Sequence, residues 1–135
     1  MQKIKLLLSA VFICSACLSL KAQSPELNES MERGAELYSN FCLNCHLSEG
    51  EGASGVFPPL AKSDYLLTKR HESIQAVKYG ISGGITVNGV AYNSAMAPMG
   101  LSDKEVADVM NYILNSWGNE DGEIVTEAEV SKIQP

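Results

Sequence analysis

Apolar residues recur with helical spacing near both ends of the predicted domain. In SMERGAELYSNFCLNCH, residues 30–46, they fall three to four positions apart, which predicts one face of a helix. We expect Ser30 to cap the start of this helix, after a polar lead-in over residues 23–29. Glycine inside a helix costs about 1 kcal/mol relative to alanine. Gly34 therefore predicts a close crossing by another helix.

The strongest helical pattern lies in LSDKEVADVMNYILNSWG, residues 101–118. Its apolar residues form a broad stripe. Ser102 and Glu105 form a capping box at its start, and Gly118 is predicted to end the helix. Residues 119–135 are expected to form an acidic tail with one short helix.

The segment between these helices is predicted to hold loops, two short helices and a hairpin. GEGASGVFPPL, residues 50–60, is rich in glycine and is expected to be a loop. Short helices are expected to start near Ser63 and to cover HESIQAVKY, with Gly80 as the stop. ITVNGVAY alternates about an Asn-Gly pair, which predicts a β-hairpin. The fold class is therefore mainly α, with one domain over residues 30–118.

Residues 1–22 have the pattern of an export signal. Lys3 and Lys5 precede an apolar run that is too short to remain as a membrane anchor. Cleavage is predicted after Ala22, which gives an exported, soluble periplasmic domain without an integral membrane span. A lipoprotein cut before Cys17 is the alternative, although the preceding residues fit a lipobox poorly.

The charge balance narrows the class of partner. The chain has ten Lys and Arg residues against sixteen Asp and Glu, and the leader contains three of the lysines and no acid. Such an acidic domain is expected to repel nucleic acid and anionic lipid. A protein partner with a basic docking patch is expected instead.

CLNCH, which contains Cys42, Cys45 and His46, allows three chemistries. A redox dithiol needs its first cysteine at a helix N-terminus that follows a strand, but this pair follows a helix. A structural zinc site needs four ligands. The other histidine, His71, lies in the charged segment TKRHES and is expected to be solvated. The third chemistry is attachment of haem.

Haem attachment is favoured because the rest of the chain supplies what it requires. Thioether bonds from Cys42 and Cys45 would hold the porphyrin, with His46 as the proximal iron ligand. The second ring nitrogen of His46 needs an acceptor, for which the carbonyl of Pro58 in VFPPL is the candidate.

A sixth iron ligand has to come from further along the chain. Met96 and Met99 lie on the loop SAMAPMG before the last helix. Methionine sulfur stabilises reduced iron and suits an electron carrier. Spacing alone does not choose between the two residues.

These motifs together resemble class I cytochromes c. The helix with Gly34 and Tyr38, CLNCH, VFPPL, the methionine loop and the helix with Tyr112 occur in the order of that family. GVFPPLAKSDYL and ITVNGVAYNSAM resemble the cytochrome domains that are attached to, or serve, copper nitrite reductases and related respiratory enzymes. The resemblance implies crossing N- and C-terminal helices, short helices, loops and a small hairpin around one covalent haem c.

The resemblance also implies the remaining site residues. In those relatives the ligand methionine follows a YN pair and commonly precedes proline. Alignment on YN places Met96 at the ligand position, with Ala97 in place of proline and Met99 as the alternative. Pro58 and Leu60 are expected to contact the cofactor.

An electron carrier, and not an enzyme by itself, is the function that the resemblance implies, because both axial positions of the iron are filled. The implied partners are a quinol-oxidising complex and a terminal reductase or oxidase, with a nitrite reductase among the candidates. Two alternatives are a haem sensor or peroxidase-like protein with a displaceable methionine, and a dedicated cytochrome subunit of one reductase complex.

Overall fold

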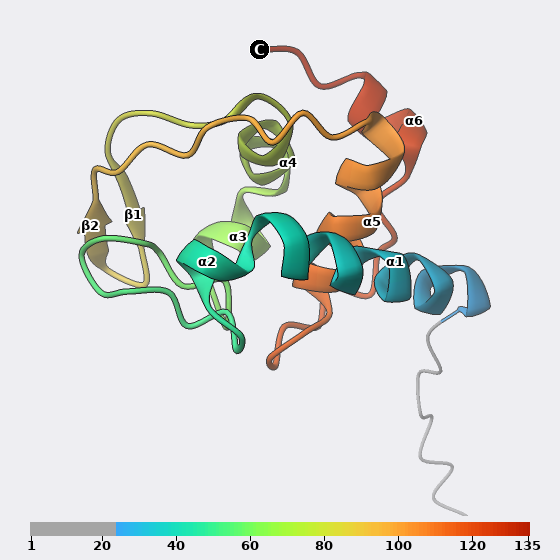
Figure 1. The fold of residues 1–135 in the computed structure, drawn as a ribbon, viewed down its shortest axis with the longest axis horizontal. Coiled ribbons are helices and arrows are strands. Elements are labelled where there is room, and N and C mark those ends of the chain that lie inside the picture. Colours follow the sequence, from blue (N-terminus) through green and yellow to red (C-terminus); the bar gives the residue numbers. More distant parts are fainter. Residues whose placement is uncertain (1–23) are drawn as a thin grey trace, which may run out of the picture.

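The computed structural model describes residues 24–135, which form a mainly helical fold with one two-stranded antiparallel sheet. The predicted export signal and Cys17 lie outside the described residues. Figure 1 shows the order of the elements along the chain. They are α1 (Pro25–Phe41), α2 (Leu43–His46), α3 (Asp64–Thr68), α4 (Arg70–Tyr79), β1 (Ile85–Val87), β2 (Val90–Tyr92), α5 (Asp103–Leu114) and α6 (Glu127–Ser131).

Helix α1 begins earlier than its apolar pattern predicted. Ser24 caps the helix by accepting a hydrogen bond from the amide of Leu27 at 3.1 Å. Pro25 occupies the first turn, where a missing amide proton has no cost. The predicted cap at Ser30 is wrong, because Ser30 is buried within the helix and binds Asp108. Most of the predicted lead-in over residues 23–29 is therefore helix.

Helices α1 and α5 cross at Gly34, as the sequence predicted (Figure 1). A Cβ atom on Gly34 would lie 2.1 Å from the carbonyl oxygen of Asp108 and 2.7 Å from the Cβ of Tyr112. The two backbones therefore touch at this point. The apolar stripe of α5 is buried beneath the crossing, and Val106, Val109 and Met110 are fully inaccessible.

A partly buried polar network centred on Asp108 joins the two helices at the crossing. The Asp108 carboxylate accepts hydrogen bonds from Ser30 at 2.6 Å and from Arg33 at 2.8 Å. Lys104 binds the same carboxylate at 2.8 Å. Burial alone would raise the pKa of Asp108, but these donors outweigh it and lower the pKa to about 2. The carboxylate is consequently charged at neutral pH, and it ties α1 to α5.

Three aromatic rings fill the other side of the crossing. Tyr38 and Tyr112 lie 5.5 Å apart between ring centroids, and Trp117 contacts both rings. Helix α5 ends at Leu114 and not at the predicted Gly118. Its early end lets Trp117 adopt a positive φ of 53° and turn back onto the tyrosines.

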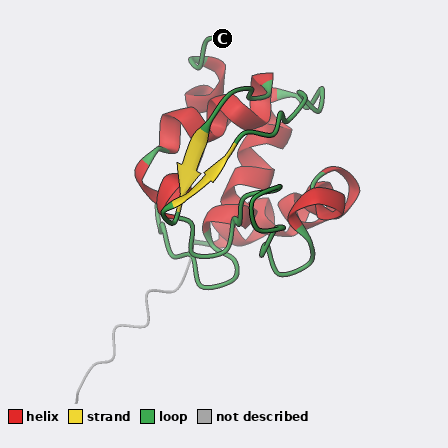
Figure 2. Cartoon of the chain, turned by 90° about the vertical axis from the view of Figure 1, so that its left-hand side faces the viewer, coloured by secondary structure: helices red, strands yellow, loops and turns green. Residues whose placement is uncertain are grey.

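The short elements agree with their sequence signals. Ser63 caps α3, Gly80 ends α4, and the Ser102–Glu105 capping box opens α5. The hairpin pairs Val87 with Val90 across the Asn-Gly turn. Seen from the hairpin side, the two strands lie in front of the helices (Figure 2).

Residues 119–135 form part of the packed domain. Val125, Val130 and Ile133 belong to the hydrophobic core, with at most 4% of each residue exposed. Arg70 of α4 holds this segment through ion pairs with Asp121 and Glu129. The boundary predicted at residue 118 therefore does not correspond to a gap in the packing. Within residues 24–135, no helix is long and apolar enough to cross a membrane.

Gly34→Ala should destabilise the protein. The new methyl group meets backbone atoms of α5, and overpacking of this kind costs about 1–3 kcal/mol. The gain of about 1 kcal/mol in helix propensity offsets only part of that cost. Denaturant unfolding measures the difference, with Asn28→Ala on the exposed face of α1 as the control. Equal stability of the two variants would contradict the close crossing.

Candidate functional site

Cys42, Cys45 and His46 lie on one helical turn at the end of α1. Cys42 ends α1, and α2 follows immediately, with the amide of His46 bonded to the carbonyl of Cys42 at 3.0 Å. Leu47 then reverses the chain with a positive φ of 62°. Cys42 is half-buried and Cys45 is exposed. One short segment thus presents two thiols and an imidazole toward the same cavity.

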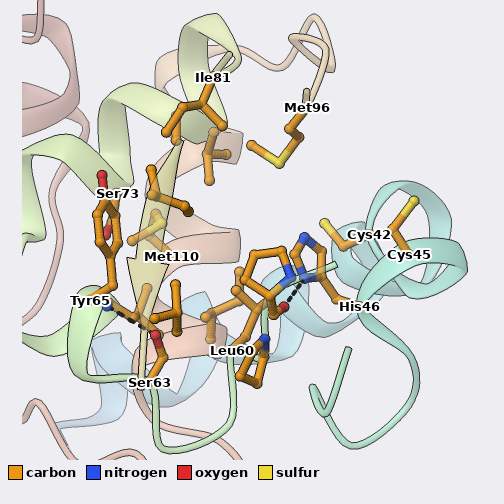
Figure 3. A pocket seen from close by; sticks show the side chains of 18 of the residues that line it. Cys42, Cys45, His46, Leu60, Ser63, Tyr65, Ser73, Ile81, Met96 and Met110 are labelled. Carbon is orange, nitrogen blue, oxygen red and sulfur yellow. Dashed lines mark hydrogen bonds between the residues drawn. The ribbon is translucent and has the colours of Figure 1, made fainter. Parts of the chain in front are cut away.

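The imidazole of His46 is oriented by the carbonyl of Pro58. Its Nδ1 lies 3.0 Å from that oxygen, so Nδ1 carries the proton and donates it. Burial lowers the pKa of His46, although the hydrogen bond with Pro58 works in the opposite direction. The ring is therefore neutral at physiological pH. Its second nitrogen, Nε2, has a free lone pair on the side of the cavity (Figure 3).

The carbonyl of Pro58 is positioned by the glycine-rich loop. Gly52 has a positive φ of 60°, and its amide binds the carbonyl of His46 at 3.0 Å. A Cβ atom at Gly52 would lie 2.4 Å from the carbonyl oxygen of Phe57 and 2.7 Å from that of Pro58. Only glycine lets the loop close this tightly against His46.

Met96 is held at the cavity by its own backbone. Its amide and carbonyl both pair with Ile81, at 2.8 and 2.9 Å. Gly80 permits the pairing, because a Cβ atom there would lie 2.6 Å from the carbonyl oxygen of Met96. The Met96 side chain points into the space above His46 (Figure 3). Met99 also lines the cavity, so the structure brings both candidate methionines to it.

The cavity between these residues is apolar and opens to solvent. Its empty space, counted together with the open mouth, is about 940 Å³. Pro58 and Leu60, both predicted cofactor contacts, lie in its wall. Among the described residues, those that line the cavity include no Lys, Arg, Asp or Glu.

Several wall residues were missed by the sequence analysis. Helix α4 contributes Ser73, Ala76 and Val77, and the segments around it contribute Tyr65 and Ile81. The spacing of three and four positions along α4 was the available signal, since it puts Ser73, Ala76 and Val77 on one face. Nothing in that spacing distinguishes a face that packs on protein from one that packs on a cofactor.

The two alternative chemistries gain no support from the geometry. Burial raises the pKa of Cys42 to about 11, and the neighbouring Cys45 adds to this shift. A redox dithiol needs the opposite shift, toward a stable thiolate. In the described part of the chain, no three His, Cys, Asp or Glu side chains cluster in a way that could hold a metal ion.

The family model described as cytochrome c matches residues 31–117. With the helical fold and the Cys-x-x-Cys-His turn beside an apolar cavity, this match defines a class I c-type cytochrome. The chain belongs to the cytochrome c family. It accordingly binds haem c covalently and acts as an electron carrier. The apolar wall and the neutral His46 beside two cysteines fit this group.

The relatives include small cytochromes and larger subunits. Cytochrome c-552 of Thermus thermophilus is 40% identical over 91 residues, which cover 64% of this chain and 69% of that protein. The cytochrome c subunit of the quinone alcohol dehydrogenase of Gluconobacter oxydans is 35% identical over 105 residues, covering 75% of this chain and 22% of that subunit. The CcoP subunit of the cbb3-type cytochrome c oxidase of Rubrivivax gelatinosus is 29% identical over 107 residues, covering 77% of this chain and 32% of that subunit. The chain thus spans a third or less of these two larger subunits.

Gly52→Ala should disturb the orientation of His46 more than a matched change at Gly55. Both glycines have positive φ, of 60° and 73°, so each alanine carries the left-handed strain of about 1–2 kcal/mol. Only at Gly52 does the new Cβ meet backbone, since nothing lies within 4 Å of a Cβ at Gly55. The Nδ1 proton of His46 should therefore exchange faster with solvent in Gly52→Ala, as measured by NMR. Equal exchange rates in the two variants would contradict this role of Gly52.

Proposed function

We propose that Cys42 and Cys45 hold the haem through thioether bonds, and that His46 and Met96 are the axial ligands of its iron. The hydrogen bond between His46 and Pro58 carries this proposal. It fixes the imidazole in the tautomer whose Nε2 is free to bind a metal, and it makes that nitrogen more basic. Histidines that ligate metals depend on such an acceptor.

The haem supplies one-electron chemistry at its iron, and the chain controls the conditions for it. Pro58 and Leu60 would cover one side of the cofactor and exclude water. The uncharged wall offers no carboxylate to stabilise a positive charge, so it favours the reduced state. A methionine ligand acts in the same direction. These features together support a carrier with a relatively high reduction potential.

Met96 is proposed over Met99 because its backbone is fixed on both sides. The paired amide and carbonyl hold Met96 against Ile81. Alignment with the resembling cytochrome domains favours the same residue. Ala97 in place of proline leaves Met99 as the competing ligand, three positions further along the loop.

The proposed setting is the periplasm, with residues 1–22 as the export signal that precedes the cytochrome domain. A lipid anchor at Cys17 is the alternative form of attachment. The named relatives support redox protein partners, since two of them are cytochrome subunits of a dehydrogenase and of an oxidase. Within that group we propose exchange between a quinol-oxidising complex and a terminal oxidase or reductase.

Expression with cytochrome c maturation machinery should give a red protein whose haem resists extraction by acidified acetone. The resistance follows from thioether bonds at Cys42 and Cys45. Mass spectrometry should show one doubly attached haem in the wild type. In Cys42→Ala and Cys45→Ala it should show either no covalent haem or a singly attached haem in lower yield. His71→Ala is the control and should match the wild type. Full extraction of haem from the wild type would refute the attachment.

Replacing each methionine in turn should identify the sixth ligand. Met96→Ala should abolish the sulfur-to-iron charge-transfer band of the oxidised protein and lower the midpoint potential, within the roughly 0.8 V range that axial ligation spans. Met99→Ala should keep the band and shift the potential only slightly, because it changes packing alone. Loss of the band in Met99→Ala with retention in Met96→Ala would transfer the assignment to Met99.

A further inference from the structure

Ser73 places a hydroxyl group in the wall of the cavity. It lies on α4 with 6% of the residue exposed. Its Oγ has no hydrogen-bond partner within residues 24–135. Leaving a buried hydroxyl without a partner costs about 1–3 kcal/mol. Because Ser73 is one of the residues that line a cofactor cavity, we look for the missing partner among the atoms of the cofactor.

Two hydroxyl side chains of the cavity lining lie at one end. Ser73 and Tyr65, from α4 and α3, lie at the end remote from Cys42 and Cys45 (Figure 3). The hydroxyl of Tyr65 also makes no hydrogen bond that the described residues record, and burial raises its pKa, so it remains a donor at neutral pH. The wall between the two ends is apolar. The cavity therefore suits a flat molecule with hydrogen-bond acceptors on one edge only.

Haem has this distribution of groups. Its two carboxylates project from the edge of the macrocycle opposite the two vinyl groups. If the vinyl groups are bonded to Cys42 and Cys45, the carboxylates would lie toward the end formed by α3 and α4. A carboxylate only accepts hydrogen bonds, whereas the serine hydroxyl can donate.

We propose that Ser73 donates a hydrogen bond to a carboxylate of the haem, with Tyr65 as a second donor at the same edge. This inference rests on the proposed attachment through Cys42 and Cys45. It assigns Ser73 to binding of the cofactor and not to the protein core.

The cations nearby in the sequence are engaged elsewhere. Arg70 binds Asp121 and Glu129, and Lys78 binds Asp103. No Lys or Arg is among the residues that line the cavity in the described part of the chain. Neutral donors therefore have to satisfy the carboxylate, and no cation in the wall can compensate for the loss of one.

Infrared difference spectroscopy between the reduced and oxidised holoprotein tests the assignment. Labelling the haem carboxylates with ¹³C, through labelled 5-aminolevulinate, identifies their bands. Ser73→Ala should shift a labelled carboxylate band away from its wild-type frequency, because the carboxylate loses a donor. It should also lower the midpoint potential, since the negative charge near the iron is less dispersed. Ser73→Thr keeps the hydroxyl and should restore the wild-type band.

The controls separate this inference from the proposed function. Ser131→Ala removes an exposed serine of α6 and should leave the labelled bands unchanged. If Ser73→Ala retains covalent haem and the charge-transfer band but its labelled bands do not move, the role of Ser73 is refuted and the proposed function stands. If Ser73→Ala does not attach haem, Ser73→Cys can replace it, since the thiol is a weaker donor of similar shape. Labelled carboxylate bands that do not shift in Ser73→Cys would also refute the role of Ser73. Extractable haem in the wild type instead refutes the attachment itself.

Discussion

The backbone contact between α1 and α5 at Gly34 joins the helix that leads into the Cys-x-x-Cys-His turn to a helix that lines the cavity. Helix α1 ends in the turn that carries Cys42, Cys45 and His46, and α5 supplies Met110 and Ile113 to the cavity wall. Because no side chain lies between the two helices at Gly34, their backbones approach closely. The Asp108 carboxylate accepts hydrogen bonds from Ser30 and Arg33 across the same contact. A side chain at Gly34 that pushed the helices apart would also move the cysteines relative to the wall formed by α5.

The loops add what the helices cannot provide. A helical turn places His46 near the cavity but leaves its ring free to rotate. The loop that passes through Gly52 brings back a carbonyl, from Pro58, that removes this freedom. On the opposite side, Gly80 and Ile81 anchor the backbone of Met96 in the same manner. Both proposed axial ligands are thus held near glycines with positive φ, at points where a side chain would strike a carbonyl oxygen.

Local patterns predicted most of the fold because each of them has a local cause. The Ser102–Glu105 capping box, the Asn-Gly turn and the stop at Gly80 depend on residues within a few positions of one another, and all of them formed as expected. The start of α1 was misplaced because Pro25 resembles a loop signal and only its position in the first turn makes it favourable. The end of α5 was misplaced because the turn at Trp117 depends on contacts with Tyr38 and Tyr112, which lie on other parts of the chain.

The candidate site was predictable to the extent that its chemistry is encoded in a motif. Cys42, Cys45 and His46 are adjacent in the sequence, and the acceptor at Pro58 followed from the need of a ligating histidine for a partner. Ser73 and Tyr65 carry no such motif, since isolated hydroxyl residues on a helix face are common. Their importance becomes visible only when burial and the missing hydrogen-bond partner of Ser73 are known.

The uncharged lining of the cavity has an electrostatic consequence for the whole molecule. Acidic residues are concentrated on α1 and in residues 119–135, which Figure 1 places away from the hairpin, whereas the lining of the cavity contains no Asp, Glu, Lys or Arg. The net negative charge of the domain is therefore carried by surfaces outside the lining of the cavity. Attraction to a basic surface would act on those surfaces and not on the cavity lining. At physiological ionic strength, salt would screen such attraction beyond about 8 Å.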